Sequence, residues 1–174
     1  MTAPLLVFGW GNPSRGDDAL GPMFVEQLCR MAGDGCEGRV EFLDDFQLQV
    51  EHALDLAGRE RVLFVDASRH CAAPFEATVL RAARDASFTT HAMSPESVLQ
   101  VFRDLHHAEP PPCTLLAIRG MHFELGEPAG PSALAHLALA LEWGRRWVDS
   151  DPRPGGVARL PTSGFLPDDA LTIA

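Results

Sequence analysis

The chain contains no lysine: all 14 of its basic side chains are arginines. This absence excludes Walker-type phosphate-binding lysines, Schiff-base chemistry and Ser–Lys dyads. The arginines are outnumbered by 24 Asp and Glu residues, which gives a formal net charge of −10. Because a nucleic-acid binder needs a basic surface to replace the counterions on phosphates, we expect no nucleic-acid partner.

Other absences narrow the class of protein further. The four cysteines form no CxxC pair, which disfavours a thioredoxin-type motif and a zinc ribbon. No apolar run approaches the ~20 residues of a membrane helix, and Met1–Leu5 does not read as the start of a secretory signal. We therefore expect a cytoplasmic protein with buried thiols and no membrane partner. The chain also lacks the HExxH motif of zincins and the GxSxG motif of nucleophile-elbow hydrolases.

Short apolar runs alternate with segments of helical periodicity. A length of 174 residues favours one domain. We predict strands at 5–8, 40–43, 62–65, 77–80 and 114–118, the fourth at an edge, and helices at 20–31, 48–57, 95–105 and 134–148. This order indicates an α/β fold: a three-layer sandwich with a twisted, mostly parallel five-stranded sheet and helices on both faces. We assign the domain to residues 1–149 and a Pro/Gly-rich C-terminal tail to residues 150–174.

Acidic and imidazole side chains follow three of the predicted strands, where the functional crevice of a parallel sheet lies. A glycine-rich loop follows the first strand and leads to Asp17 and Asp18 at the start of a helix. Asp66 comes directly after the third strand, and His91 lies on a loop before the helix that Ser94 and Pro95 begin. One of the two adjacent aspartates is expected to cap the helix, where its loss would be mild. The residues alone do not decide which; the resemblance described below assigns the cap to Asp17 and leaves Asp18, Asp66 and His91 as the functional residues.

Two carboxylates and one imidazole form an O,O,N donor set that suits Ni, Zn or Mn. Three protein ligands leave coordination positions for water or substrate. The residues alone leave a structural interpretation open, because an aspartate after a strand can bind backbone amides of a turn and a single histidine is often solvated.

The chain resembles the NiFe-hydrogenase maturation proteases, the HycI/HybD-type endopeptidases, over roughly residues 4–148. The resemblance rests on the opening Gly9-x-Gly11-Asn12…Asp17-Asp18-x-x-Gly21, on Asp66, and on Thr90-His91-x-Met93 before a helix. Two further segments, 45–49 (DFQLQ) and 123–128 (FELGEP), resemble the branch that serves bidirectional or NAD-linked hydrogenases.

The resemblance implies an aspartic-type endopeptidase that cuts a C-terminal extension from a hydrogenase large-subunit precursor once nickel is in place. It implies that Asp18, Asp66 and His91 contact the metal and that Asp18 and Asp66 serve catalysis. The nickel would be carried by the substrate, and Zn or Cd could replace it at the site. The partner would be the large-subunit precursor, and we expect the protease to be a monomer.

Two mechanisms are open at this point. A metal-bound water is the nucleophile with Asp66 or Asp18 as base, or the metal positions the peptide while a carboxylate activates water. Three other functions are also open: a non-catalytic chaperone for metalloprotein assembly, a peptidyl-tRNA hydrolase-like enzyme and a nucleotide-binding protein. The acidic net charge disfavours the peptidyl-tRNA hydrolase-like enzyme, which would act on RNA. Asp17 and Asp18 disfavour the nucleotide-binding protein, because they would repel the phosphate of a nucleotide.

Overall fold

The structure is a computed structural model that describes residues 1–84 and 93–150. Within these residues five strands form one sheet in the order β2-β1-β3-β5-β4. The strands are β1 (Leu5–Trp10), β2 (Val40–Asp45), β3 (Arg61–Ser68), β4 (Phe75–Val79) and β5 (Cys113–Arg119). Four of them are parallel, and only β4 runs antiparallel, at the edge beside β5. The predicted mostly parallel sheet and the edge position of the fourth strand are confirmed.

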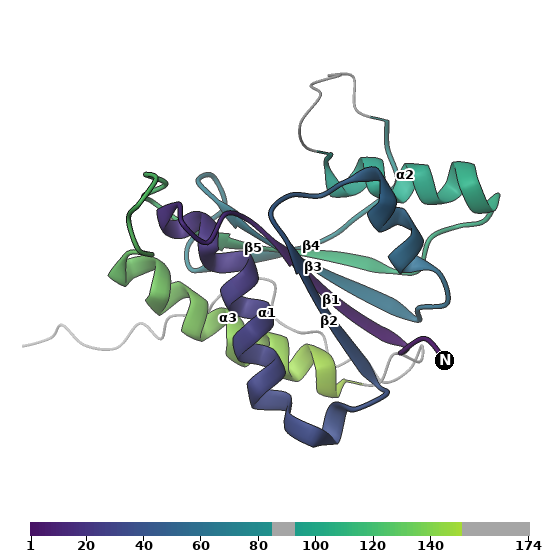
Figure 1. The fold of residues 1–174 in the computed structure, drawn as a ribbon, viewed down its shortest axis with the longest axis horizontal. Coiled ribbons are helices and arrows are strands. Elements are labelled where there is room, and N and C mark those ends of the chain that lie inside the picture. Colours follow the sequence, from purple (N-terminus) through teal and green to yellow (C-terminus); the bar gives the residue numbers. More distant parts are fainter. Residues whose placement is uncertain (85–92, 151–174) are drawn as a thin grey trace, which may run out of the picture.

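Helices cover both faces of this sheet, as Figure 1 shows. On one face lie α1 (Leu20–Ala32) and α3 (Pro131–Asp149), which pack against each other and the sheet through the larger core cluster. On the other face lie α2 (Pro95–His106) and the 3-10 helix η3 (Val50–Leu56). Two further 3-10 helices, η1 (Gly16–Ala19) and η2 (Gly33–Cys36), flank α1. The three-layer α/β sandwich is therefore confirmed.

The central strands β1 and β3 form where the apolar runs predict them because their residues are buried on both faces. Leu5 and Val7 face the cluster under α1 and α3, whereas Leu6 and Phe8 face the cluster under α2 and η3. Such strands read as continuous apolar runs rather than as alternating patterns. The predicted helix at 95–105 is confirmed as α2: the Ser94 hydroxyl accepts a hydrogen bond from the Ser97 N–H, and Pro95 occupies the first turn.

Three local predictions are wrong. The segment expected as a helix at 48–57 is the shorter 3-10 helix η3. The third strand does not end at Asp66 but continues to Ser68, because Asp66 and the two residues after it pair with β5. The predicted helix at 134–148 is α3, and its spacing places Leu134 and Ala138 on one face with Leu137; both are instead exposed, and the buried side of the helix carries Trp143 and Trp147.

No helix among residues 1–84 and 93–150 is long and apolar enough to cross a bilayer. The three buried cysteines (Cys36, Cys71 and Cys113) and the exposed Cys29 are all free thiols. The predicted tail lies outside the described residues except for Ser150, so the domain boundary at Asp149 stays a prediction.

Candidate active site

Glycines bring the first turn of α1 directly against the sheet. A Cβ atom on Gly9 would lie 2.4 Å from the carbonyl oxygen of Gly21, and a Cβ on Gly21 would lie 2.2 Å from that of Trp10. Gly11 has a φ of +144°, and a Cβ there would lie 1.9 Å from the Asp18 carbonyl oxygen. Any other residue at these positions would push the helix away from the strands. The glycine spacing therefore sets where Asp17 and Asp18 lie.

Asp18 is half-buried above the carboxyl end of β1. Its Oδ2 accepts a hydrogen bond of 2.8 Å from the backbone N–H of Asn12. The Asn12 side chain in turn accepts one of 2.9 Å from the N–H of Ser14, which closes the glycine-rich loop on itself. The Asp18 carboxylate is thus held by the loop while one of its oxygens remains without a hydrogen bond from the described residues.

Asp66 lies beside Asp18 on the sheet. On the β1 side of β3, Gly9 pairs with Val65, so the next residue, Trp10, comes close to Asp66, and its side chain donates a hydrogen bond to the carboxylate. Burial raises the pKa of Asp66 to about 7, and the charge of Asp18 acts in the same direction. Hydrogen bonds from Ala67 and Trp10 act against the shift without cancelling it. Asp66 therefore exchanges a proton near neutral pH.

The third predicted ligand, His91, lies outside the described residues. The nearest described residue after it is Met93, whose N–H donates a hydrogen bond of 3.2 Å to the carbonyl of Leu48 in the connection between β2 and η3. Among the residues that are described, no cluster of three or more His, Cys, Asp or Glu side chains could hold a metal ion. The structure brings Asp18 and Asp66 together, and the part of His91 stays a prediction.

The interpretation of Asp17 as a cap of the neighbouring helix is wrong. Asp17 is completely buried, and its carboxylate accepts three backbone hydrogen bonds from the connection between β5 and α3: from Met121 at 2.6 Å, His122 at 2.9 Å and Gly130 at 2.7 Å. Burial acts to raise the pKa of this carboxyl, but these hydrogen bonds outweigh it and lower the pKa. Asp17 is structural, as expected, but it joins segments far apart in the chain.

Two more groups at this edge escaped the sequence analysis. The ring of Trp10 lies edge-on to Phe64, 5.9 Å between centroids, and fixes the side chain that binds Asp66. His52 is buried against Phe8, and its Nε2 lies 3.2 Å from Oδ2 of Asp45. The alternation of Leu6, Phe8 and Trp10 could have placed the indole on the face of Asp66. No comparable pattern in the sequence indicates that His52 contacts Asp45 and Gln49.

No protein-family model matches the chain, and no curated protein sequence matches it. Solved structures do. The hydrogenase maturating endopeptidase HybD from E. coli superposes with a TM-score of 0.63 at 25% identity, over 83% of this chain and 91% of that one. The NiFe-hydrogenase maturation protease HycI from Thermococcus kodakarensis gives 0.64 at 20% identity, over 85% and 93%. An endopeptidase from E. coli gives 0.58 at 26% identity, over 79% and 87%.

These comparisons support the resemblance seen in the motifs: the chain has the fold of the hydrogenase maturation proteases. The match covers nearly the whole length of these two solved relatives. The branch serving bidirectional hydrogenases stays a prediction.

Asp17→Ala should destabilise the protein strongly rather than mildly. It would remove the buried acceptor of three backbone hydrogen bonds, and a hydrogen bond to a charged group contributes ~1.5–3 kcal/mol, so we expect a loss of about 3 kcal/mol or more in the free energy of unfolding, measured by urea denaturation. The matched control is Asp34→Ala, which changes an exposed aspartate of η2. Equal stabilities of the two variants would contradict the role of Asp17.

Ionisation of Asp66 should cost stability as the pH rises. The unfolded chain releases this proton near pH ~4 and the folded protein near about 7, so the free energy of unfolding falls across that window by up to ~1.4 kcal/mol per pH unit. Asp66→Asn, which is always neutral, should therefore gain stability relative to the wild type between pH 5 and pH 8. Urea denaturation of the metal-free protein at both values tests this. If the difference in free energy of unfolding between variant and wild type is the same at pH 5 and pH 8, the raised pKa of Asp66 is contradicted.

Proposed function

We propose that this protein is an endopeptidase that removes the C-terminal extension of a NiFe-hydrogenase large-subunit precursor after nickel insertion. The observation that carries the proposal is the Asp18–Asp66 pair, held by a glycine-packed loop in the fold of the maturation proteases. The segments at 45–49 and 123–128 favour a precursor of the bidirectional type.

In this proposal Asp18, Asp66 and His91 recognise the nickel that the substrate carries. Carboxylate oxygens and an imidazole are donors that nickel and zinc accept. Among the described residues only Oδ2 of Asp18 accepts a hydrogen bond, from Asn12, which leaves its other oxygen for such a contact. A positive charge between Asp18 and Asp66 would also relieve the repulsion that raises the pKa of Asp66. Substrate that carries nickel would therefore bind better than empty substrate, which is the discrimination the reaction needs.

Asp66 is the candidate general base. Its carboxylate form, which a nearby nickel ion would favour, can take a proton from a water molecule that attacks the scissile carbonyl carbon. When the C–N bond breaks, the same proton can pass to the leaving nitrogen, so that the products are a carboxylic acid and an amine. The described residues do not favour a covalent intermediate, because neither a serine nor a cysteine contacts Asp18 or Asp66 there.

Each of Asp18→Ala, Asp66→Ala and His91→Ala should abolish processing of a nickel-loaded precursor, because an incomplete site neither recognises the metal nor activates water. A gel-shift assay that separates precursor from product measures this, with nickel-loaded and nickel-free precursor side by side. The matched controls are His106→Ala and His107→Ala at the end of α2, which should process normally.

Equal cleavage of the nickel-free precursor would contradict recognition of the metal. Full activity of the Asp66 or His91 variant would contradict the assignment of the site. A wild-type protein that binds the loaded precursor without cutting it would instead indicate a non-catalytic assembly chaperone.

A further inference from the structure

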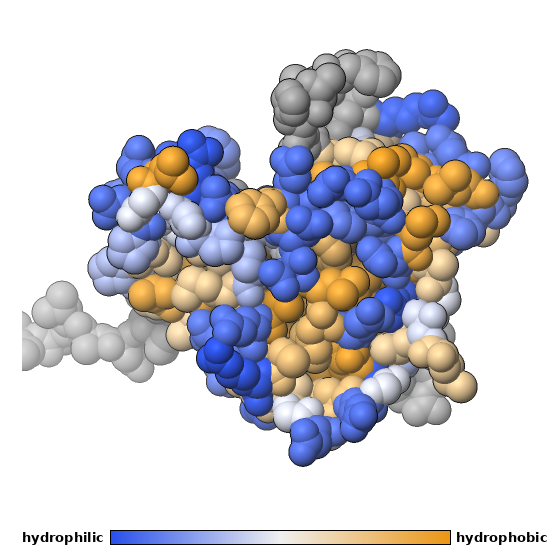
Figure 2. Space-filling view, in the orientation of Figure 1, coloured by the Kyte–Doolittle hydropathy of each residue, from blue (hydrophilic) through white to orange (hydrophobic). Residues whose placement is uncertain are grey.

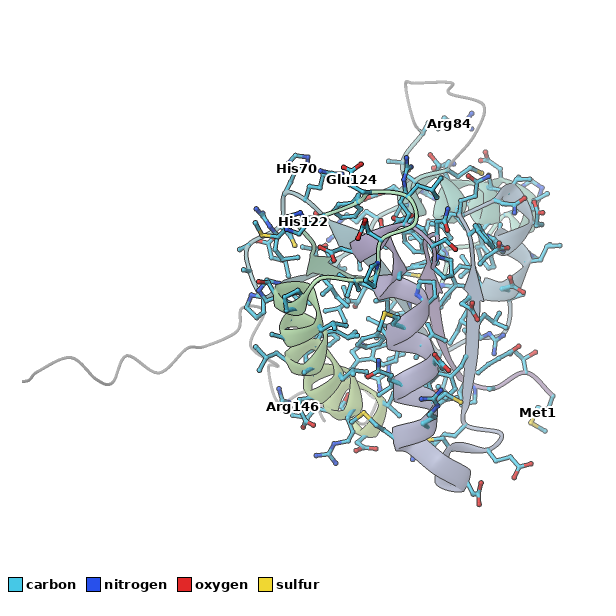
Figure 3. The ribbon with its side chains drawn as sticks, turned by 60° about the vertical axis from the view of Figure 1, so that its left-hand side comes forward. Met1, His70, Arg84, His122, Glu124 and Arg146 are labelled. Carbon is cyan, nitrogen blue, oxygen red and sulfur yellow. The ribbon has the colours of Figure 1, made fainter. Side chains whose placement is uncertain are left out.

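The connection between β5 and α3, residues 120–130, is a rigid rim with apolar side chains in solvent. Its backbone is held by the buried Asp17 carboxylate and by two more hydrogen bonds, from Gly126 to the Ser14 carbonyl at 2.7 Å and from Gly16 to the Glu127 carbonyl at 2.9 Å. Met121 and Leu125 are nevertheless 52% and 71% exposed. Figure 3 shows His122 and Glu124 of this loop above the start of α3. The loop holds its shape without burying these side chains.

The connection after β2 also combines a backbone held by hydrogen bonds with an exposed apolar side chain. Phe46 is 65% exposed, yet its backbone N–H donates a hydrogen bond of 2.6 Å to Oδ1 of Asp45. The other oxygen of Asp45 faces Nε2 of the buried His52 at 3.2 Å, while Nδ1 of His52 accepts a hydrogen bond of 2.9 Å from the N–H of Gln49. Because Nδ1 is an acceptor, Nε2 carries the proton and donates to Asp45. Hydrogen bonds around the buried His52 thus fix the backbone on which Phe46 is exposed.

The two loops lie on either side of the carboxylate pair. The N–H of Gly11 donates to the carbonyl of Asp45 at 3.1 Å, and the next residue, Asn12, binds Asp18. On the other side, Met121 binds the side chain of Asp17, the residue before Asp18. Figure 2 shows a hollow in the surface between the lobe that contains the 120–130 loop and the lobe of η3 and α2. An extended chain crossing Asp18 would meet both loops.

We propose that Phe46 on one side of Asp18 and Met121 and Leu125 on the other form a docking surface for apolar side chains of the precursor polypeptide. This inference rests on the proposed function, since it names the part of the protein that holds the peptide in place. Its occupant is the substrate chain, because the surface is continuous with the carboxylate pair and its loops are already ordered. Pre-ordered loops avoid the entropy cost of immobilisation on binding.

The test compares serine variants at exposed apolar positions at the two ends of the sheet. Phe46→Ser and Leu125→Ser remove the docking surface, and Val79→Ser is the control. Val79 is 76% exposed, but it pairs with Thr114 at the opposite edge of the sheet. Because all three side chains are exposed, the melting temperatures of the variants should equal that of the wild type.

We expect Phe46→Ser and Leu125→Ser each to raise KM for the nickel-loaded precursor about 10-fold or more, as loss of a central apolar contact does at interfaces. At saturating precursor kcat should stay near the wild-type value, and Val79→Ser should change neither constant. An unchanged KM in both docking variants, or an equal rise in the control, would overturn the inference.

A second readout separates this inference from the proposed function. Equilibrium affinity is measured by calorimetry with a nickel-loaded precursor whose scissile peptide has been replaced by an uncleavable bond, so that cleavage plays no part and the carboxylate pair stays intact. Weaker binding on adding Phe46→Ser or Leu125→Ser supports the docking surface even if the wild type proves unable to cut. Unchanged affinity overturns it even if the wild type cuts, and failure of every form to bind or cut the precursor overturns both.

Discussion

The position of every group at the site depends on close backbone packing between the start of α1 and the ends of β1 and β3. Gly9 and Gly21 allow this approach because neither carries a Cβ atom. Because of this packing, the side chains of the adjacent residues Asp17 and Asp18 point in different directions and have different roles. Asp17 turns into the protein and binds backbone amides, whereas Asp18 stays near the surface beside Asp66. A helix even slightly farther from the sheet would separate the two carboxylates.

Charge and burial then give the two carboxylates their chemistry. Asp66 is surrounded by the sheet and by Trp10, with Asp18 as a charged neighbour, so its protonated form is favoured up to near-neutral pH. Asp17 is also closed off from solvent, but it accepts three backbone N–H hydrogen bonds, and its pKa falls instead. Burial, hydrogen-bond donors and neighbouring charges therefore act together on the protonation of a carboxyl at this edge. The arrangement provides a proton acceptor without a permanent buried charge.

Much of this architecture could be predicted from local patterns, because the central strands β1 and β3 are buried on both faces and Ser94 and Pro95 mark the start of α2. The convergence of Asp18 and Asp66 follows from the geometry of parallel strands. The role of Asp17 could not be predicted, since its partners lie 104 to 113 residues away in the chain. The network of His52, Gln49 and Asp45 likewise depends on how η3 folds back, and the apolar periodicity at 48–57 indicated a longer helix there.

The central claim is that the carboxylates of Asp18 and Asp66 bind the nickel that the substrate carries. X-ray absorption at the nickel edge tests it most directly, on a nickel-loaded precursor whose scissile peptide has been replaced by an uncleavable bond. Adding the wild-type protein should increase the number of oxygen and nitrogen ligands around nickel, whereas adding an Asp18→Ala, Asp66→Ala double variant should not. A nickel spectrum that stays the same while the wild-type protein is bound would contradict the claim.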